Sequence, residues 1–209
     1  MDIISKYKVT RKGEGESPEI LTVVQEYDDY PESPRTFYDN DSTFITFESR
    51  HASPDKCEFH SCSDWADANG FDMGTSHHDL IASMEKKGFI AIPVWRYEHS
   101  GVAYEADFEN PFYDEWDSGM VGVIYISKKD ALDMCGSKRM TAKAKEMVVQ
   151  ILKAEVDIYS FYANGEVYRY SLCDSNGDVI ESLGCSFGEC KIEDIFKEFG
   201  VCELAVATA

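Results

Sequence analysis

The sequence predicts an α+β protein: a mixed or mostly antiparallel sheet with one long helix, residues 141–164, packed on a face. Apolar side chains recur every three or four residues between Met147 and Tyr162, the pattern of a helix that buries one stripe. Short runs of β-branched and aromatic residues alternate with turn residues and indicate strands. The tripeptide Ser175-Asn176-Gly177 lies between two such runs, which is typical of a β-hairpin. One long helix among many short strands favours the α+β class.

The first half of the chain supplies loops and strands. Residues 1–18 are polar and contain Gly and Pro near their end, so we expect a flexible lead-in. Residues 20–24 and 43–47 have strand character, and the second run alternates polar and apolar side chains. Residues 51–76 lack a periodic apolar face and predict an irregular insertion. We therefore expect one domain over residues 19–209.

The second half contains the strongest strand signals. Residues 89–95 form an almost continuous apolar run, in which Pro93 implies a bulge or a locally unpaired edge. Residues 102–106 are expected to pair with that run as a hairpin, and residues 120–126 form another strand. A short helix over residues 192–199 ends at a glycine.

The charge of the chain is strongly negative. The formal net charge is −19, and residues 20–120 contain 21 acidic against 6 basic residues. Such a charge repels nucleic acid and anionic membranes, so we expect no direct nucleic-acid binding. It is typical of a very soluble protein, of an acid-rich protein from a salt-loving host, or of a protein that binds a partner with a basic surface.

The cysteines and the N-terminus indicate a cytoplasmic protein. Seven cysteines, an odd number, are scattered through core-like sequence, which favours reduced thiols. The first residues lack the apolar run of a signal peptide, and no 18-residue apolar segment occurs. We expect an intracellular protein without a membrane partner.

Three short motifs occur in order along the chain. They are Ser33-Pro34-Arg35 with Tyr38-Asp39-Asn40, then Tyr97-Glu98-His99-Ser100-Gly101, then Trp116-Asp117-Ser118-Gly119-x-Val121-Gly122-x-Ile124-Tyr125. With these motifs the chain resembles a poorly characterised family of phage, archaeal-virus and mobile-element proteins over roughly residues 20–185. It departs from the family pattern at residues 51–76 and 108–115. The resemblance implies a viral or mobile-element origin and residence in the host cytoplasm, and it leaves the chemistry open.

Polar residues at two strand ends are candidates for catalysis. His99, Ser100, Asp117 and Ser118 lie at the ends of two strands that we expect to be neighbours. A histidine, a carboxylate and a serine could form a nucleophile, a base and an orienting group. Ser-Gly pairs are also ordinary turn chemistry, so a structural hydrogen-bond network is the competing interpretation.

A second group could bind zinc, the one cofactor that the sequence suggests. Soft ligands gather in and just after the irregular insertion, at Cys57, His60, Cys62, His77 and His78. The spacing is not that of a Cys-x2-Cys pair, so loop packing and surface histidines remain the alternative.

Acidic and aromatic residues are interleaved shortly before the third motif. The candidate partner-binding residues are Asp107, Glu109, Phe112, Tyr113, Asp114, Glu115, Trp116 and Asp117. Carboxylates can imitate the phosphates of a nucleic acid, and aromatic side chains supply the anchors of an interface.

Our leading hypothesis is a non-enzymatic, virus-encoded protein that binds a basic surface of a host nucleic-acid-binding or defence protein. Two alternatives stay open. One is a small hydrolase or metal-dependent enzyme that uses His99, Asp117 and Ser118, and the other is a structural accessory protein without an active site.

Overall fold

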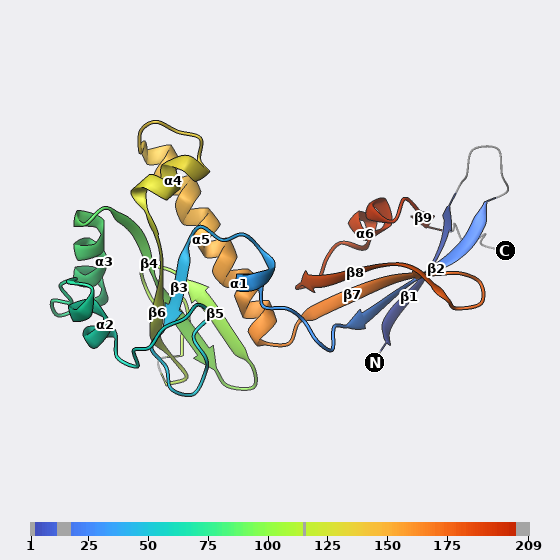
Figure 1. Ribbon diagram of the computed structural model, residues 1–209. Helices are drawn as coiled ribbons and strands as arrows, with labels where there is room; N and C mark the ends of the chain where they lie inside the picture. Colours follow the sequence, from blue (N-terminus) through green and yellow to red (C-terminus); the bar gives the residue numbers. More distant parts are fainter. Residues whose placement is uncertain (1–2, 12–17, 115, 204–209) are drawn as a thin grey trace. The chain divides into compact units, whose positions relative to one another are not determined.

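The computed structural model describes residues 3–11, 18–114 and 116–203 (Figure 1). The chain divides into two compact units: a terminal unit of residues 1–32 and 165–209, and a central unit of residues 33–164. The expectation of a single domain over residues 19–209 differs from this division. The reason is long-range pairing, because strands from the two ends of the chain join one sheet while the middle of the chain builds another.

The terminal unit is an antiparallel five-stranded sheet in the order β8-β7-β2-β1-β9. Its elements are β1 (Ile3–Arg11), β2 (Glu19–Tyr27), β7 (Val167–Cys173), β8 (Val179–Phe187), α6 (Ile192–Glu198) and β9 (Cys202–Glu203). The predicted hairpin around residues 175–177 is confirmed as β7–β8. Helix α6 packs Ile195 and Phe196 into the apolar core of this sheet.

The sequence suggested a flexible lead-in over residues 1–18, but residues 3–11 form strand β1, so the expectation is wrong for these residues. Residues 12–17 lie outside the described part of the chain. The strand forms because Val9 pairs with Leu21 of β2 and both are buried beneath α6. Lys6 and Lys8 of the same strand lie on the face opposite Val9, where they line a cavity of the terminal unit.

The central unit contains an antiparallel four-stranded sheet in the order β3-β6-β4-β5. Its strands are β3 (Thr43–Thr46), β4 (Phe89–Glu98), β5 (Val102–Ala106) and β6 (Ser118–Ser127). Its helices are α1 (Pro34–Phe37), α2 (Cys62–Ala68), α3 (His77–Lys86), α4 (Lys128–Met134) and α5 (Ala142–Ala163). The two antiparallel sheets and the 22-residue helix α5 confirm the α+β class.

Helix α5 covers one face of the central sheet, as the apolar stripe predicted. The Thr141 hydroxyl caps its first turn, and the chain leaves the helix through Gly165, whose φ of 75° suits glycine. Val148, Leu152 and Val156 are fully buried against the sheet. Truncating Leu152 to alanine would leave a cavity that costs about 2–5 kcal/mol.

Helices α2 and α3 cover the opposite face, so the central unit has three layers (Figure 1). Trp65 of α2 and Leu80 and Met84 of α3 pack on Ala91 and Val123 of the sheet. Helix α2 thus gives order to part of the 51–76 segment, because its tryptophan brings a large apolar surface to the core.

Close pairing of β3 with β6 requires a glycine at position 122 of the third motif. A Cβ on Gly122 of β6 would lie 2.1 Å from the carbonyl oxygen of Ile45 on β3, so a side chain there would push the strands apart. Pro93 itself stays in register with Val123 of β6, and the register of β4 with β6 shifts just after it, between Val94 and Trp95, so the expected irregularity lies beside Pro93 rather than at it.

The arginine of the first motif forms a buried ionic network. Arg35 donates to Asp55 through Nε at 3.0 Å and Nη2 at 2.8 Å, and through Nη1 to Glu155 of α5. Only 4% of its side chain is exposed. Burial would lower the pKa of Arg35, but the hydrogen bonds and charges of Asp55 and Glu155 outweigh it and raise that pKa. The network fastens α1 and the segment after β3 to the long helix.

No helix in the described part of the chain is long and apolar enough to cross a membrane.

Candidate functional site

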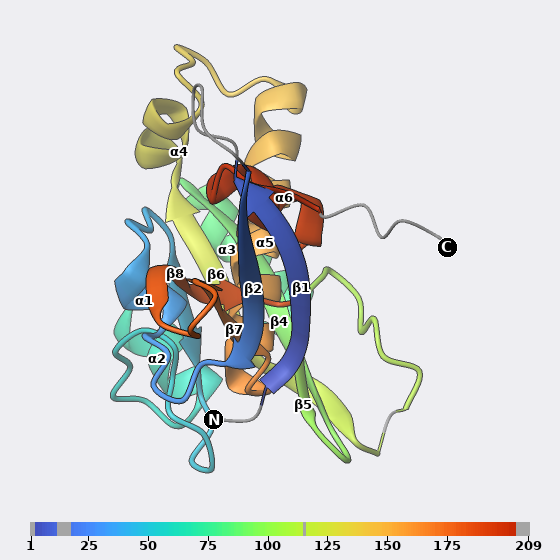
Figure 2. The ribbon, with the colours of Figure 1, turned by 90° about the vertical axis from the view of Figure 1, so that its right-hand side faces the viewer.

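Residues 107–117, here called the acidic loop, connect β5 to β6 and contain five acidic and no basic residues. Figure 2 shows this loop, in yellow-green, projecting away from the sheet. Its ends are fixed by paired strands, since Ser118 pairs with Tyr97 and Ala106 with Val94. Those candidate partner-binding residues that the structure describes therefore lie on one projecting segment.

Hydrogen bonds within the acidic loop hold its conformation. Asn110 Oδ1 accepts from the Phe112 N–H at 3.0 Å, and Asn110 Nδ2 donates to Ser118 Oγ at 2.9 Å. Ser118 Oγ donates in turn to the Asp114 carbonyl at 2.5 Å, and Asp114 Oδ1 accepts from the Trp116 N–H at 3.0 Å. These bonds order the loop in the free protein, which lowers the entropy that binding must remove.

The aromatic side chains of the acidic loop divide into two kinds. Phe112 is half-buried and stacks on Tyr97, with ring centroids 5.6 Å apart, so it anchors the loop to β4. Tyr113 and Trp116 are 106% and 96% exposed, and Phe108 is 36% exposed. Two large aromatic side chains in full contact with solvent are the feature that most distinguishes this surface.

The carboxylates of the loop also divide. Asp107 bonds Lys153 of α5, and Asp117 bonds His99, so both have partners within the protein. Burial would raise the pKa of Asp107, but hydrogen bonds from Lys153 and the Phe108 N–H leave it below its usual value. Asp114 and Glu109 are exposed, although Asp114 accepts from the Trp116 N–H and Glu109 lies 3.4 Å from His78 Nε2. Glu115 lies outside the described residues.

The catalytic candidates come together only in part. His99 Nδ1 and Asp117 Oδ2 are 3.0 Å apart, at the ends of strands that are neighbours as expected. Ser118 Oγ instead donates to the Asp114 carbonyl, and Ser100 lies in the exposed turn between β4 and β5. The structure therefore contains a His99–Asp117 pair, but the adjacent Ser118 hydroxyl bonds the backbone of the acidic loop instead of the histidine.

An ionic cluster around Arg96 adjoins this pair and was not anticipated from the sequence. Arg96 lies between two carboxylates, Glu48 Oε1 at 2.5 Å and Glu98 Oε2 at 3.1 Å, and His51 Nε2 lies 3.4 Å from the same Glu98 oxygen. Burial raises the pKa of Glu48, and the hydrogen bond from His51 lowers the pKa of Glu98. Sequence spacing does not indicate this cluster, because Glu48 and His51 lie just before and at the start of the irregular 51–76 segment, far along the chain from Arg96.

An open depression of about 530 Å³ extends from the His99–Asp117 pair to Arg96 and Glu98. It is lined by Arg50, Arg96, Glu98, His99, Trp116, Asp117, Ser118, Gly119 and Val121. Residues of the second and third motifs thus face one surface hollow beside the acidic loop.

The zinc candidates do not form one cluster. Cys57 Sγ contacts the Phe59 carbonyl at 3.6 Å and Cys62 Sγ contacts Met73 Sδ at 3.6 Å, while His60 is exposed. Burial raises the pKa of the Cys62 thiol to about 11. His77 and His78 begin α3 and lie beside Glu109 instead.

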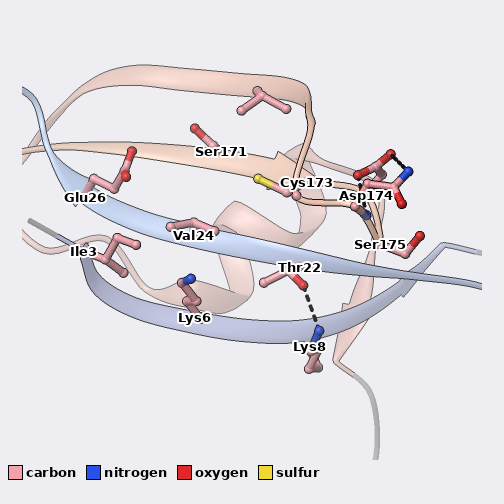
Figure 3. Close-up of a pocket in the computed structure, with 13 residues that line it drawn as sticks. Ile3, Lys6, Lys8, Thr22, Val24, Glu26, Ser171, Cys173, Asp174 and Ser175 are labelled. Atoms are coloured by element: carbon pink, nitrogen blue, oxygen red, sulfur yellow. Dashed lines mark hydrogen bonds between the residues drawn. The ribbon is translucent and has the colours of Figure 1, made fainter. Parts of the chain in front are cut away.

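The terminal unit carries a separate cavity of about 530 Å³ on the sheet face opposite α6 (Figure 3). Lys6 and Lys8 of β1, Thr22 of β2 and Cys173 of β7 line it, and Lys8 Nζ donates to Thr22 Oγ1 at 3.1 Å. Burial raises the pKa of Cys173, so its sulfur is a neutral thiol near pH 7. None of the candidates named from the sequence lies in this cavity.

Comparison with known proteins gave no match: no protein-family model, no curated protein and no solved structure matches this chain.

Proposed function

We propose that this chain is a non-enzymatic interaction protein that binds a basic surface of a partner through its acidic loop. The observation that carries the proposal is the pair Tyr113 and Trp116, fully exposed on a loop that its own hydrogen bonds hold in place. Burying aromatic surface of this kind supplies much of the free energy of protein association.

Charge defines the class of partner. Asp114 lies between the aromatic anchors Tyr113 and Trp116, Glu109 precedes them in the loop, and the whole protein carries a net charge of −19. A basic surface is attracted by this field, whereas an acidic one is repelled. Proteins that bind nucleic acid carry such surfaces, so the partner is a nucleic-acid-binding or defence protein of the host. The chain would compete there with phosphate as a nucleic-acid mimic.

The resemblance of the three motifs to phage, archaeal-virus and mobile-element proteins suggests where this interaction takes place. A virus or mobile element would encode the chain, and binding would occur in the host cytoplasm. The restrained loop supports this role, because a preordered surface loses little conformational entropy when it meets its target.

A capture experiment tests the proposal. The tagged protein and its Tyr113→Ala/Trp116→Ala variant are incubated with host lysate at low and at moderately high salt. The proposal requires one nucleic-acid-binding protein that the wild type retains, salt releases, added DNA or RNA displaces, and the double variant fails to retain. Equal retention by the double variant would refute it.

A second candidate function is hydrolysis at the His99–Asp117 pair. It is favoured by their 3.0 Å contact, because a carboxylate on Nδ1 leaves Nε2 free to accept a proton from water. Glu98 lines the same hollow, and its carboxylate is held below its usual pKa by the hydrogen bond from His51. A His99→Ala variant with undiminished biological effect would exclude this function.

A further inference from the structure

We propose that His77, His78 and Glu109 form a binding site for a divalent first-row transition-metal ion. One ligand atom from each residue lies within 4.8 Å of the other two. Among the described residues, this is the one group of three or more histidine, cysteine or acidic side chains so arranged. The site joins the first turn of α3 to the acidic loop, two segments about thirty residues apart in the sequence.

Neighbouring contacts hold the first histidine. His77 Nε2 lies 3.0 Å from the Phe108 carbonyl oxygen, which can only accept, so Nε2 carries the hydrogen and Nδ1 keeps its lone pair. The His77 ring also packs against Trp95 in a T-shaped arrangement, with centroids 5.3 Å apart. A backbone carbonyl that fixes the tautomer of a histidine is the usual outer partner of a metal ligand.

The segment that carries Glu109 is held as well. Trp95 Nε1 donates to the Asp107 carbonyl at 2.8 Å, and the Asp107 carboxylate bonds Lys153. The Glu109 carboxylate lies 3.4 Å from His78 Nε2. Two residues before Glu109 the chain is therefore fixed to β4 and to α5, so its position beside α3 is determined by the fold.

The donor set matches the chemistry of zinc and its neighbours in the periodic table. Two imidazole nitrogens and a carboxylate oxygen suit Zn²⁺, and three protein ligands leave a coordination position for water. Zn–N bonds of about 2.0–2.1 Å require the ligand atoms to draw closer together. His78 and Glu109 have side chains that are 53% and 79% exposed, so they can rotate toward an ion without disturbing the core.

Titration of the full chain with Zn²⁺, followed by calorimetry, tests the site. We expect one equivalent to bind the wild type, and both His78→Ala and Glu109→Gln to weaken binding ~10-fold or more, since loss of an outer partner alone costs that much. His60→Ala is the matched control, because His60 is an exposed histidine outside the cluster. It should bind as the wild type does.

Cysteine provides the competing source of ligands, and a second variant separates the two. Cys57→Ser/Cys62→Ser should keep the binding, and Co²⁺ bound in place of zinc should show no thiolate-to-metal charge-transfer band. Absence of saturable binding, unchanged affinity in Glu109→Gln, or loss of binding in the double cysteine variant would overturn the proposal. The capture experiment in metal-free buffer is independent of these results.

Discussion

Asp114 Oδ1 accepts a hydrogen bond from the backbone N–H of Trp116 at 3.0 Å, so a charged side chain and an exposed aromatic anchor belong to one turn. The carboxylate therefore has two roles that mutation can separate. It shapes the turn, and it contributes negative charge to the acidic loop.

Asparagine and alanine at position 114 should behave differently. Asp114→Asn keeps an oxygen that can accept from the Trp116 N–H and removes only the charge, so binding should weaken by about 1 kcal/mol or less at low salt. Asp114→Ala also removes the acceptor and should weaken binding further at every salt concentration. Affinities measured for both variants against the captured partner check this, and equal losses would show that the turn does not position the tryptophan.

Removing the exposed aromatic side chains should affect binding and leave folding intact. Tyr113→Ala and Trp116→Ala should each cost about 2 kcal/mol or more of binding free energy, as anchors of an interface do. Their unfolding free energies should stay within about 0.5 kcal/mol of the wild type, because neither side chain is buried. Urea denaturation beside a binding assay makes this comparison.

Phe112→Ala is the informative contrast in the same loop. Phe112 stacks on Tyr97, so its loss should destabilise the folded protein, by about 1–3 kcal/mol for a half-buried ring. If Phe112→Ala were as stable as the wild type, the loop would not be anchored through this residue.

The sequence predicted local structure well and long-range structure poorly. The long helix followed from its apolar stripe, its Thr141 cap and the glycine after it, and the β7–β8 hairpin followed from its turn residues. The division into two units did not follow from any local pattern, because it depends on the pairing of β2 with β7. In this pairing Val23 lies opposite Leu172, at the other end of the chain. No local pattern encodes such a partner.

The candidate site shows the same limit. His99 and Asp117 could be placed together because strand ends that pair bring them together. The stacking of Phe112 on Tyr97 and the approach of Glu109 to His78 depend on how a loop folds back, which residue spacing does not determine.

The buried arginine network should be essential to the stability of the central unit. Arg35→Ala leaves two carboxylates, Asp55 and Glu155, without their buried cation, and we expect a loss of about 3–5 kcal/mol. Arg35→Lys should recover only part of this loss, because an ammonium cannot bond both oxygens of Asp55 in parallel. Chemical denaturation of the two variants measures the difference, and a stable Arg35→Ala protein would contradict the structural role of the first motif.

The Arg96 cluster predicts a pH dependence with a definite sign. Burial raises the pKa of Glu48 above its ordinary value of 4.5. The stability that its protonated form contributes is complete below pH 4.5 and is lost as the pH rises through the higher folded-state pKa. Each unit of that rise corresponds to about 1.4 kcal/mol.

Glu48→Gln, which does not titrate, supplies the reference for this effect. From about pH 4 to pH 7 the wild type should lose stability relative to the variant, as measured by urea denaturation at each pH. A constant difference would show that the pairing with Arg96 offsets the burial of Glu48, and a relative gain by the wild type would show that the pairing outweighs the burial.

The most direct test of the proposed function is the dissociation constant for the captured partner, measured over a range of salt concentrations for the wild type and for Tyr113→Ala/Trp116→Ala. We predict that wild-type affinity falls steeply as salt rises, because screening weakens attraction between the acidic loop and a basic surface. The double variant should bind more weakly at every salt concentration. A wild-type affinity that does not depend on salt, or a double variant that binds as tightly as the wild type, would contradict the proposal that the acidic loop binds a basic partner.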